Sequence, residues 1–161
     1  MIVVSDTSPL CYLVLIADEH LLPQLFGDVL VPPDVLEELA DPRSPQVLRD
    51  WLATPPTWLR SQSPTVIDPT LQVDSGEAAA ISLALEVQCD ALLVDDRKAR
   101  SAAQARGIVT LDTLTVLEIA AERGLIELPP AVAKLRATNF RISKRMIDQA
   151  LQRDAARCRR P

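Results

Sequence analysis

Short runs of aliphatic residues recur along the 161-residue chain, and a stretch with helical character separates each run from the next. This alternation is typical of a parallel α/β sheet, in which a crossover helix follows each strand. Strands of such a sheet are buried on both faces, so they consist of uninterrupted Val, Ile and Leu. Aromatic residues make up only 3% of the chain, and the core must therefore be aliphatic. Strands are expected at 2–5, 29–31, 58–61, 91–94 and 108–111.

Capping residues, glycine and proline mark where the helices begin and end. Ser8-Pro9 has the signature of a helix start, with Ser as the N-cap and Pro as the first helical residue. Gly124 follows a helical stretch, as is common after the last turn. Pro129-Pro130 then sets off a basic C-terminal portion. Helices are expected at 9–17, 19–26, 34–40, 45–53, 75–87, 97–106, 113–123 and 143–157.

Length and charge predict one domain with a basic C-terminal end. A chain of 161 residues suits a single hydrophobic core. We expect the domain to span 1–147 and a basic helix or tail to span 148–161. Residues 131–161 contain nine Lys or Arg against two Asp, a net charge of +7, which leaves −12 on residues 1–130. The basic end either meets a polyanion or forms a solvated helix face that balances the acidic body.

Cellular location is predicted from apolar runs and cysteines. The longest apolar run is interrupted by Asp18 and Glu19, so none is long enough to cross a bilayer. The first residues lack the basic start of a secretion signal. Three widely spaced cysteines suit neither a disulfide framework nor a metal-ligand motif. We therefore expect a cytoplasmic protein with reduced thiols and no membrane partner.

Two of the expected strands end in aspartate, Asp6 after the first and Asp95-Asp96 after the fourth. Ligand sites in open parallel sheets form at the carboxyl ends of strands, so these acids can meet in one crevice. An Asp at such a position can instead cap the next helix. Ser8 already provides the first cap, and only one Asp of the pair is needed for the other. Asp6 and at least one of the pair are therefore candidate functional residues.

Helical geometry separates Glu37 from Glu38. At about 100° per residue, Val35, Leu36 and Leu39 define an apolar face. Glu38 lies at the border of this face, while Glu37 points away from it. A border position lets a carboxylate reach a crevice, so Glu38 is the better candidate.

Glu77 has a structural explanation from spacing alone. Asp74-Ser75-Gly76-Glu77 has the spacing of a capping box, with Asp as the N-cap and Glu three residues on. An acid in the first turn also complements the helix dipole. Spacing therefore favours a structural role for Glu77.

Histidine and glycine are rare in the chain, and their scarcity limits the kinds of active site that it can form. The single histidine, His20, has no partner motif, which argues against a histidine triad or a zinc site. With only four glycines, the chain has no glycine-rich phosphate loop. What remains is a set of carboxylate oxygens, which suit Mg²⁺ or Mn²⁺.

Four segments of the chain form a pattern by their order and spacing: residues 4–10, 30–39, 76–81 and 92–100. Together they resemble the PIN fold, and more narrowly the domain-of-unknown-function 3368 branch of VapC-like toxins. The resemblance extends to about residue 147 and implies a three-layer α/β sandwich, with a short, mainly parallel central sheet flanked by helices. It also implies a prokaryotic Mg²⁺- or Mn²⁺-dependent endoribonuclease.

The resemblance also assigns roles to residues and partners. It implies hydrolysis of RNA by metal-activated water, with Arg97, Lys98, Arg100 and the basic tail binding the RNA backbone. It further implies a type II toxin–antitoxin pair, in which a small antitoxin blocks the acidic site, and a homodimer. It makes Glu77 a functional candidate, which its spacing does not. The implied metal-binding and catalytic residues are Asp6, Glu38, Glu77, Asp95 and Asp96.

Asp112 departs from the pattern of this branch, which favours glycine at that place. An acid there either adds a metal contact or disturbs the local turn, and both possibilities stay open. A catalytically silent, PIN-like binding or regulatory module is the main alternative, although the intact acid set argues against it. A receiver-type phosphoacceptor domain ranks last, because it requires an acidic pair after the first strand and a lysine after the last.

Overall fold

The computed structural model of the chain describes residues 1–160 and contains one five-stranded sheet in which every neighbouring pair is parallel. The order across the sheet is β3-β2-β1-β4-β5, so the first strand of the chain lies in the centre. This confirms the predicted α/β fold with a short central sheet. The strands are β1 (Val3–Ser5), β2 (Val29–Val31), β3 (Leu59–Ser61), β4 (Ala91–Leu93) and β5 (Thr110–Leu111).

Nine helices connect and cover these strands within residues 1–160. Most lie within one to three residues of the bounds expected from the sequence. They are α1 (Thr7–Leu15), α2 (Leu21–Phe26), α3 (Pro33–Leu39), α4 (Gln46–Ala53), α5 (Ser75–Glu86), α6 (Arg97–Gln104), α7 (Thr113–Glu122), α8 (Leu128–Arg136) and α9 (Lys144–Cys158).

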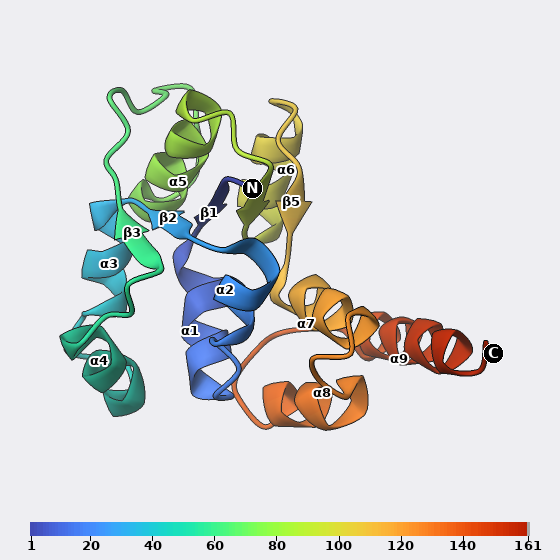
Figure 1. Ribbon diagram of the computed structural model, residues 1–161. Coiled ribbons are helices and arrows are strands. Elements are labelled where there is room, and N and C mark those ends of the chain that lie inside the picture. Colours follow the sequence, from blue (N-terminus) through green and yellow to red (C-terminus); the bar gives the residue numbers. More distant parts are fainter. Residues whose placement is uncertain (161) are drawn as a thin grey trace.

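Successive residues of the central strand face opposite sides of the sheet, and each side is covered by its own helices. Val3 belongs to a large core shared with α1, α2, α7 and α8, whereas Val4 belongs to a smaller core shared with α5 and α6. Figure 1 shows α5 and α6 on one side of the strands and α1, α2, α7 and α8 on the other. The result is a three-layer sandwich whose two cores are aliphatic.

Helix α8 was not expected from the sequence. The sequence predicts only that Pro129 and Pro130 set off the basic C-terminal portion, whereas the structure places both in the first turn of α8, immediately after Leu128. Proline is tolerated there because the first backbone N–H groups of a helix have no intrahelical partner. A proline pair therefore starts this helix and does not interrupt one.

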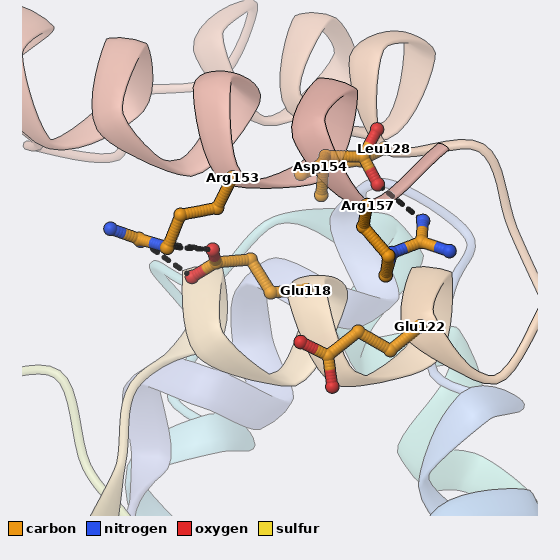
Figure 2. Close-up of a pocket in the computed structure, with 6 residues that line it drawn as sticks. All are labelled: Glu118, Glu122, Leu128, Arg153, Asp154 and Arg157. Atoms are coloured by element: carbon orange, nitrogen blue, oxygen red, sulfur yellow. Dashed lines mark hydrogen bonds and ion pairs between the residues drawn. The ribbon is translucent and has the colours of Figure 1, made fainter. Parts of the chain in front are cut away.

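The basic C-terminal end forms the long helix α9, which packs on α7 and α8 through buried Ile147 and Ala150. The boundary predicted between residues 147 and 148 falls inside this helix, and Pro161 lies outside the described residues. Figure 2 shows Arg153 of α9 reaching Glu118 of α7. No helix among the described residues is both apolar and long enough to traverse a bilayer.

Candidate active site

A cleft of about 620 Å³ opens where β1 and β4 end at the carboxyl edge of the sheet. Acidic side chains from four segments form one part of its lining, and residues of α1 and of the α8–α9 connection form another. We call this the acidic cleft. It is lined by Asp6, Thr7, Ser8, Cys11, Tyr12, Glu38, Asp74, Glu77, Asp95, Asp96, Arg97, Asn139, Phe140 and Arg141.

Asp6 is the most buried acid of the cleft, with a side chain that follows β1 directly and is only 4% exposed. It occupies the N-cap position of α1, yet it makes no side-chain capping bond, and its Oδ1 has no hydrogen-bond partner. Burial raises the pKa of Asp6 to about 7. The Thr7 backbone opposes this rise in pKa, whereas the charges of Glu77, Asp74 and Glu38 add to it. A buried, unpartnered carboxylate of this kind requires a cation or a proton.

Glu37 and Glu38 of α3 are both exposed, but only Glu38 lines the cleft. Oε2 of Glu38 accepts a hydrogen bond of 2.8 Å from Oγ1 of Thr7. The first turn of α5 approaches this carboxylate so closely that a Cβ atom on Gly76 would lie 3.0 Å from Oε2. The absence of a side chain at Gly76 therefore leaves room for Glu38.

Glu77 combines the structural role predicted from spacing with a place in the cleft. The capping box of α5 is formed, since the Glu77 N–H donates to Asp74 Oδ1 at 2.8 Å and the Asp74 N–H donates to Glu77 Oε2 at 3.2 Å. Burial raises the pKa of Glu77 to about 7, with further increases from the charges of Asp74, Asp96 and Glu38. Capping thus places this carboxylate among the other acids and does not exclude it from the site.

The two aspartates after β4 have different surroundings, and Asp95 is the enclosed one. Its Oδ1 accepts from the Thr113 N–H at 2.7 Å, and its Oδ2 accepts from Thr113 Oγ1 at 2.7 Å and from Ser8 Oγ at 2.8 Å. Burial raises the pKa of Asp95, and the charge of Asp112 raises it further, whereas these three hydrogen bonds lower it. The prediction that Ser8 caps α1 was wrong, because α1 begins at Thr7 and Ser8 instead binds Asp95.

Asp96 caps α6, as one of the pair was expected to do. Its Oδ1 accepts from the Ala99 N–H at 2.9 Å, while the residue as a whole is exposed and lines the cleft. Of the cations expected to bind nucleic acid, Arg97 lines the cleft, whereas Arg100 pairs with Asp112 at 2.8 Å. Asp96 and Arg97 are thus the cleft residues at the start of α6.

Asp112, whose role the sequence left open, does not line the acidic cleft. It caps α7, where its Oδ1 accepts from the Thr115 N–H at 2.8 Å and from Thr115 Oγ1 at 2.7 Å. Its Oδ2 forms the ion pair with Arg100. The structure therefore assigns Asp112 to helix capping and shows no disturbed turn.

Several lining residues were not identified as site residues from the sequence. Tyr12 and Asn139 carry no local motif, and Arg141 stood out only as one of the basic residues of 131–161. Asn139 and Arg141 lie in the α8–α9 connection, far along the chain from the acids. Asp74 was identified only as a cap. The tertiary contact between α1 and the α8–α9 connection brings Tyr12, Asn139 and Arg141 to the cleft.

The carboxylates provide suitable donors for a divalent cation, although they do not form a complete coordination shell. Among residues 1–160, no three His, Cys, Asp or Glu side chains are arranged as a metal site. The donors are nonetheless hard oxygens, the type that Mg²⁺ and Mn²⁺ prefer, and Oδ1 of Asp6 is buried without a partner. Asp6, Glu38, Glu77 and Asp96 line the same cleft. Asp95 has hydrogen bonds to both of its oxygens.

Comparison with known proteins agrees with the architecture. No curated protein matches the sequence. The family profile of domain of unknown function 3368, described as a PIN domain, matches residues 2–155 and so covers nearly the whole chain. The chain therefore belongs to this PIN-domain family.

Proposed function

We propose that the protein is a Mg²⁺- or Mn²⁺-dependent endoribonuclease, and that it is the toxin of a type II toxin–antitoxin pair. Membership of a family of nucleases supports phosphodiester hydrolysis. The observation that carries the proposal is the buried Oδ1 of Asp6, which lacks a partner beside Glu38 and Glu77. Clustered carboxylates repel one another, and a divalent cation is the partner that relieves this repulsion.

Different residues of the cleft have different roles in the proposed reaction. A bound divalent ion would lower the pKa of a water molecule and neutralise charge on the phosphate. Asp6, Glu38, Glu77 and Asp96 provide the carboxylate oxygens that hold this ion. Thr7 orients Glu38, and the capping box orients Glu77, so both carboxylates are positioned by hydrogen bonds.

Asp95 takes part in this site as a positioning residue. Its hydrogen bonds to Ser8 of α1 and Thr113 of α7 join the end of β4 to the two helices beside it. Asp96 is the next residue in the chain, so the same bonds position the backbone that carries Asp96. Of the two acids, Asp96 is therefore the proposed ligand.

The test is cleavage of a broad single-stranded RNA pool by purified protein with Mg²⁺ or Mn²⁺, compared with EDTA and with Asp6→Asn. We expect metal-dependent cutting that falls by more than about 100-fold in the variant, because it removes a ligand and not merely a group supporting one. Equal activity in Asp6→Asn would remove Asp6 from the mechanism. RNA binding without cleavage, together with no metal binding, would instead favour the silent binding module, which the lack of a complete coordination shell supports.

The proposed partners follow from the charge of the cleft. Six carboxylates line it against two arginines, so a basic side chain of a small antitoxin would find complementary charge there. Co-expression with the product of a neighbouring gene should yield a complex without nuclease activity. Light scattering of the free protein tests the proposed homodimer, and a monomeric mass would contradict it.

A further inference from the structure

The part of the acidic cleft that carries no carboxylate comes from two distant segments. Asn139, Phe140 and Arg141 lie in the connection between α8 and α9, and Tyr12 lies on α1. We call residues 138–142 the α8–α9 segment. None of its residues has a role in holding the proposed metal ion, yet three of them line the same cleft.

The α8–α9 segment is fixed to α1 by specific contacts. The Tyr12 hydroxyl donates to Asn139 Oδ1 at 3.0 Å, and the rings of Tyr12 and Phe140 meet edge to face with centroids 4.7 Å apart. Thr138 joins the segment to α8, because its Oγ1 donates to the Leu135 carbonyl at 2.6 Å. The segment is thus positioned relative to the acids before any ligand arrives, which lowers the entropy cost of binding.

Charge distinguishes the two sides of the cleft. Within the described part of the chain, Arg97 and Arg141 are the two cations that line it, and neither belongs to an ion pair. A guanidinium group beside a carboxylate cluster would be expected to pair with it, as Arg100 does with Asp112. The unpaired state leaves the N–H donors of Arg141, which match phosphate geometry, open to a ligand.

We propose that the α8–α9 segment, together with Tyr12, is a nucleotide subsite next to the cleavage point, and that Arg141 binds the phosphate flanking the one that is cut. This inference rests on the proposed ribonuclease function. Asn139 uses Oδ1 to accept from Tyr12, so its amide N–H groups are the ones that remain to donate to the RNA. The half-buried Phe140 ring gives the neighbouring base an apolar surface.

The test measures binding of a fluorescent single-stranded RNA of mixed sequence by anisotropy, in Mg²⁺ and in the Asp6→Asn background, which does not cut. The control for Arg141→Gln is Arg145→Gln, which removes an equal charge. Arg145 is exposed, lies outside the cleft and belongs to no ion pair within residues 1–160. We expect Arg141→Gln to raise Kd about 10-fold and to reduce the slope of log K against log salt by about 0.7, the value for one phosphate contact on a single strand. Arg145→Gln should change Kd less than about 2-fold.

Tyr12→Phe provides a second variant that keeps the ring and removes only the hydrogen bond to Asn139. We expect a smaller rise in Kd with an unchanged salt slope, because no charge is lost. Thermal melting of each variant checks that the fold is retained. With Asp6 intact, Arg141→Gln should raise KM more than it lowers kcat.

Two outcomes would overturn the inference: equal effects of Arg141→Gln and Arg145→Gln, or no measurable RNA binding by the Asp6→Asn protein. Failure of the proposed function is distinguishable from both. If the unmodified protein never cuts RNA, but Arg141→Gln still weakens binding selectively, the phosphate contact of Arg141 stands, while the nuclease assignment and the cleavage point beside the contact fall. If the unmodified protein cuts RNA and Arg141→Gln behaves like the control, only the subsite falls.

Discussion

The acidic cleft and the surface between α7 and α9 both contain carboxylates, but they balance the charge differently. Between α7 and α9, Arg153 binds both oxygens of Glu118, and Arg157 pairs with Asp154 (Figure 2). In the acidic cleft, the carboxylates outnumber the cations, and Oδ1 of Asp6 has no partner. Both arginines of the first surface pair with a carboxylate of the protein, although Glu122 there belongs to no ion pair within residues 1–160. Neither arginine of the cleft is paired in this part of the chain, so the contrast lies in the arginines and in the buried, unpartnered oxygen of Asp6.

This difference also changes how the basic C-terminal end is interpreted. Arg153 and Arg157 do not form a free polyanion-binding surface, because they pair with acids of α7 and of α9 itself. Lys144, Arg145 and Arg159 belong to no ion pair within residues 1–160. The pairing of Arg153 and Arg157 therefore supports a helix face that balances acidic charge, whereas polyanion binding by the basic end stays a prediction.

The largest expected effect is on stability without divalent ions. Because the pKa of Asp6 rises from 3.8 to about 7 in the folded protein, the folded state binds this proton more tightly than the unfolded state. The resulting stability is complete below pH 3.8 and is lost as pH rises to about 7, and it amounts to a few kcal/mol at most.

Urea unfolding across this pH range measures the effect as the difference between the unmodified protein and Asp6→Asn. Relative to the unmodified protein, Asp6→Asn should gain stability as pH rises from 3.8 to about 7, because only the unmodified protein loses the tightly bound proton. Addition of Mg²⁺ should stabilise the unmodified protein more at pH 8 than at pH 5. Parallel pH curves for the two proteins would contradict the assignment of an uncompensated charge to Asp6.

The next effect separates the two aspartates after β4. Asp95→Asn would replace one carboxylate oxygen with an amide N–H₂ group, which cannot accept the hydrogen bonds that Ser8 and Thr113 donate. We therefore expect a loss of about 1–3 kcal/mol in the free energy of unfolding. Asp96→Asn keeps a good N-cap and should change stability by less than about 0.5 kcal/mol. Its RNA cleavage should nevertheless fall at least about 10-fold. The opposite pattern would exchange the roles of the two residues.

Gly76→Ala tests how closely α5 can approach Glu38. The new Cβ would lie 3.0 Å from Glu38 Oε2, which must move by a few tenths of an ångström. We expect cleavage to fall, by less than about 10-fold, while alanine in the helix keeps or raises stability by up to about 1 kcal/mol. Ser75→Ala, in the same turn but exposed, is the matched control. A parallel loss of stability and activity in Gly76→Ala would argue against a local effect on Glu38.

The smallest effect is expected at the ion-paired surface. Arg153 is 61% exposed, so Arg153→Gln should lower the free energy of unfolding by less than about 1 kcal/mol. RNA cleavage should be unchanged, because this arginine already binds Glu118 and lies outside the cleft. Denaturation and cleavage assays measure both quantities. A large loss of activity would show that this surface contacts RNA and would remove the contrast with the acidic cleft.

The sequence by itself determined the features that depend on neighbouring residues. Aliphatic runs predicted the strands, and the capping box of Asp74 and Glu77 forms as its spacing predicts. Helical periodicity also distinguished Glu38 from Glu37, because burial on α3 follows the apolar face. Hydrogen bonds within one turn and the pattern of burial are local, so the sequence can specify them directly.

Two features were decided only by the tertiary structure: which of Asp95 and Asp96 is enclosed, and which residues lie opposite the acids in the cleft. Asp95 binds Ser8, 87 residues away, and Asn139 binds Tyr12, 127 residues away. Ser8 had a satisfactory local explanation as a cap, but it was wrong, because a hydroxyl bonds whichever acceptor the packed sheet brings near. Contacts at such separations depend on how strands and helices pack together. Nothing in the flanking residues of Ser8 or Asn139 predicts them.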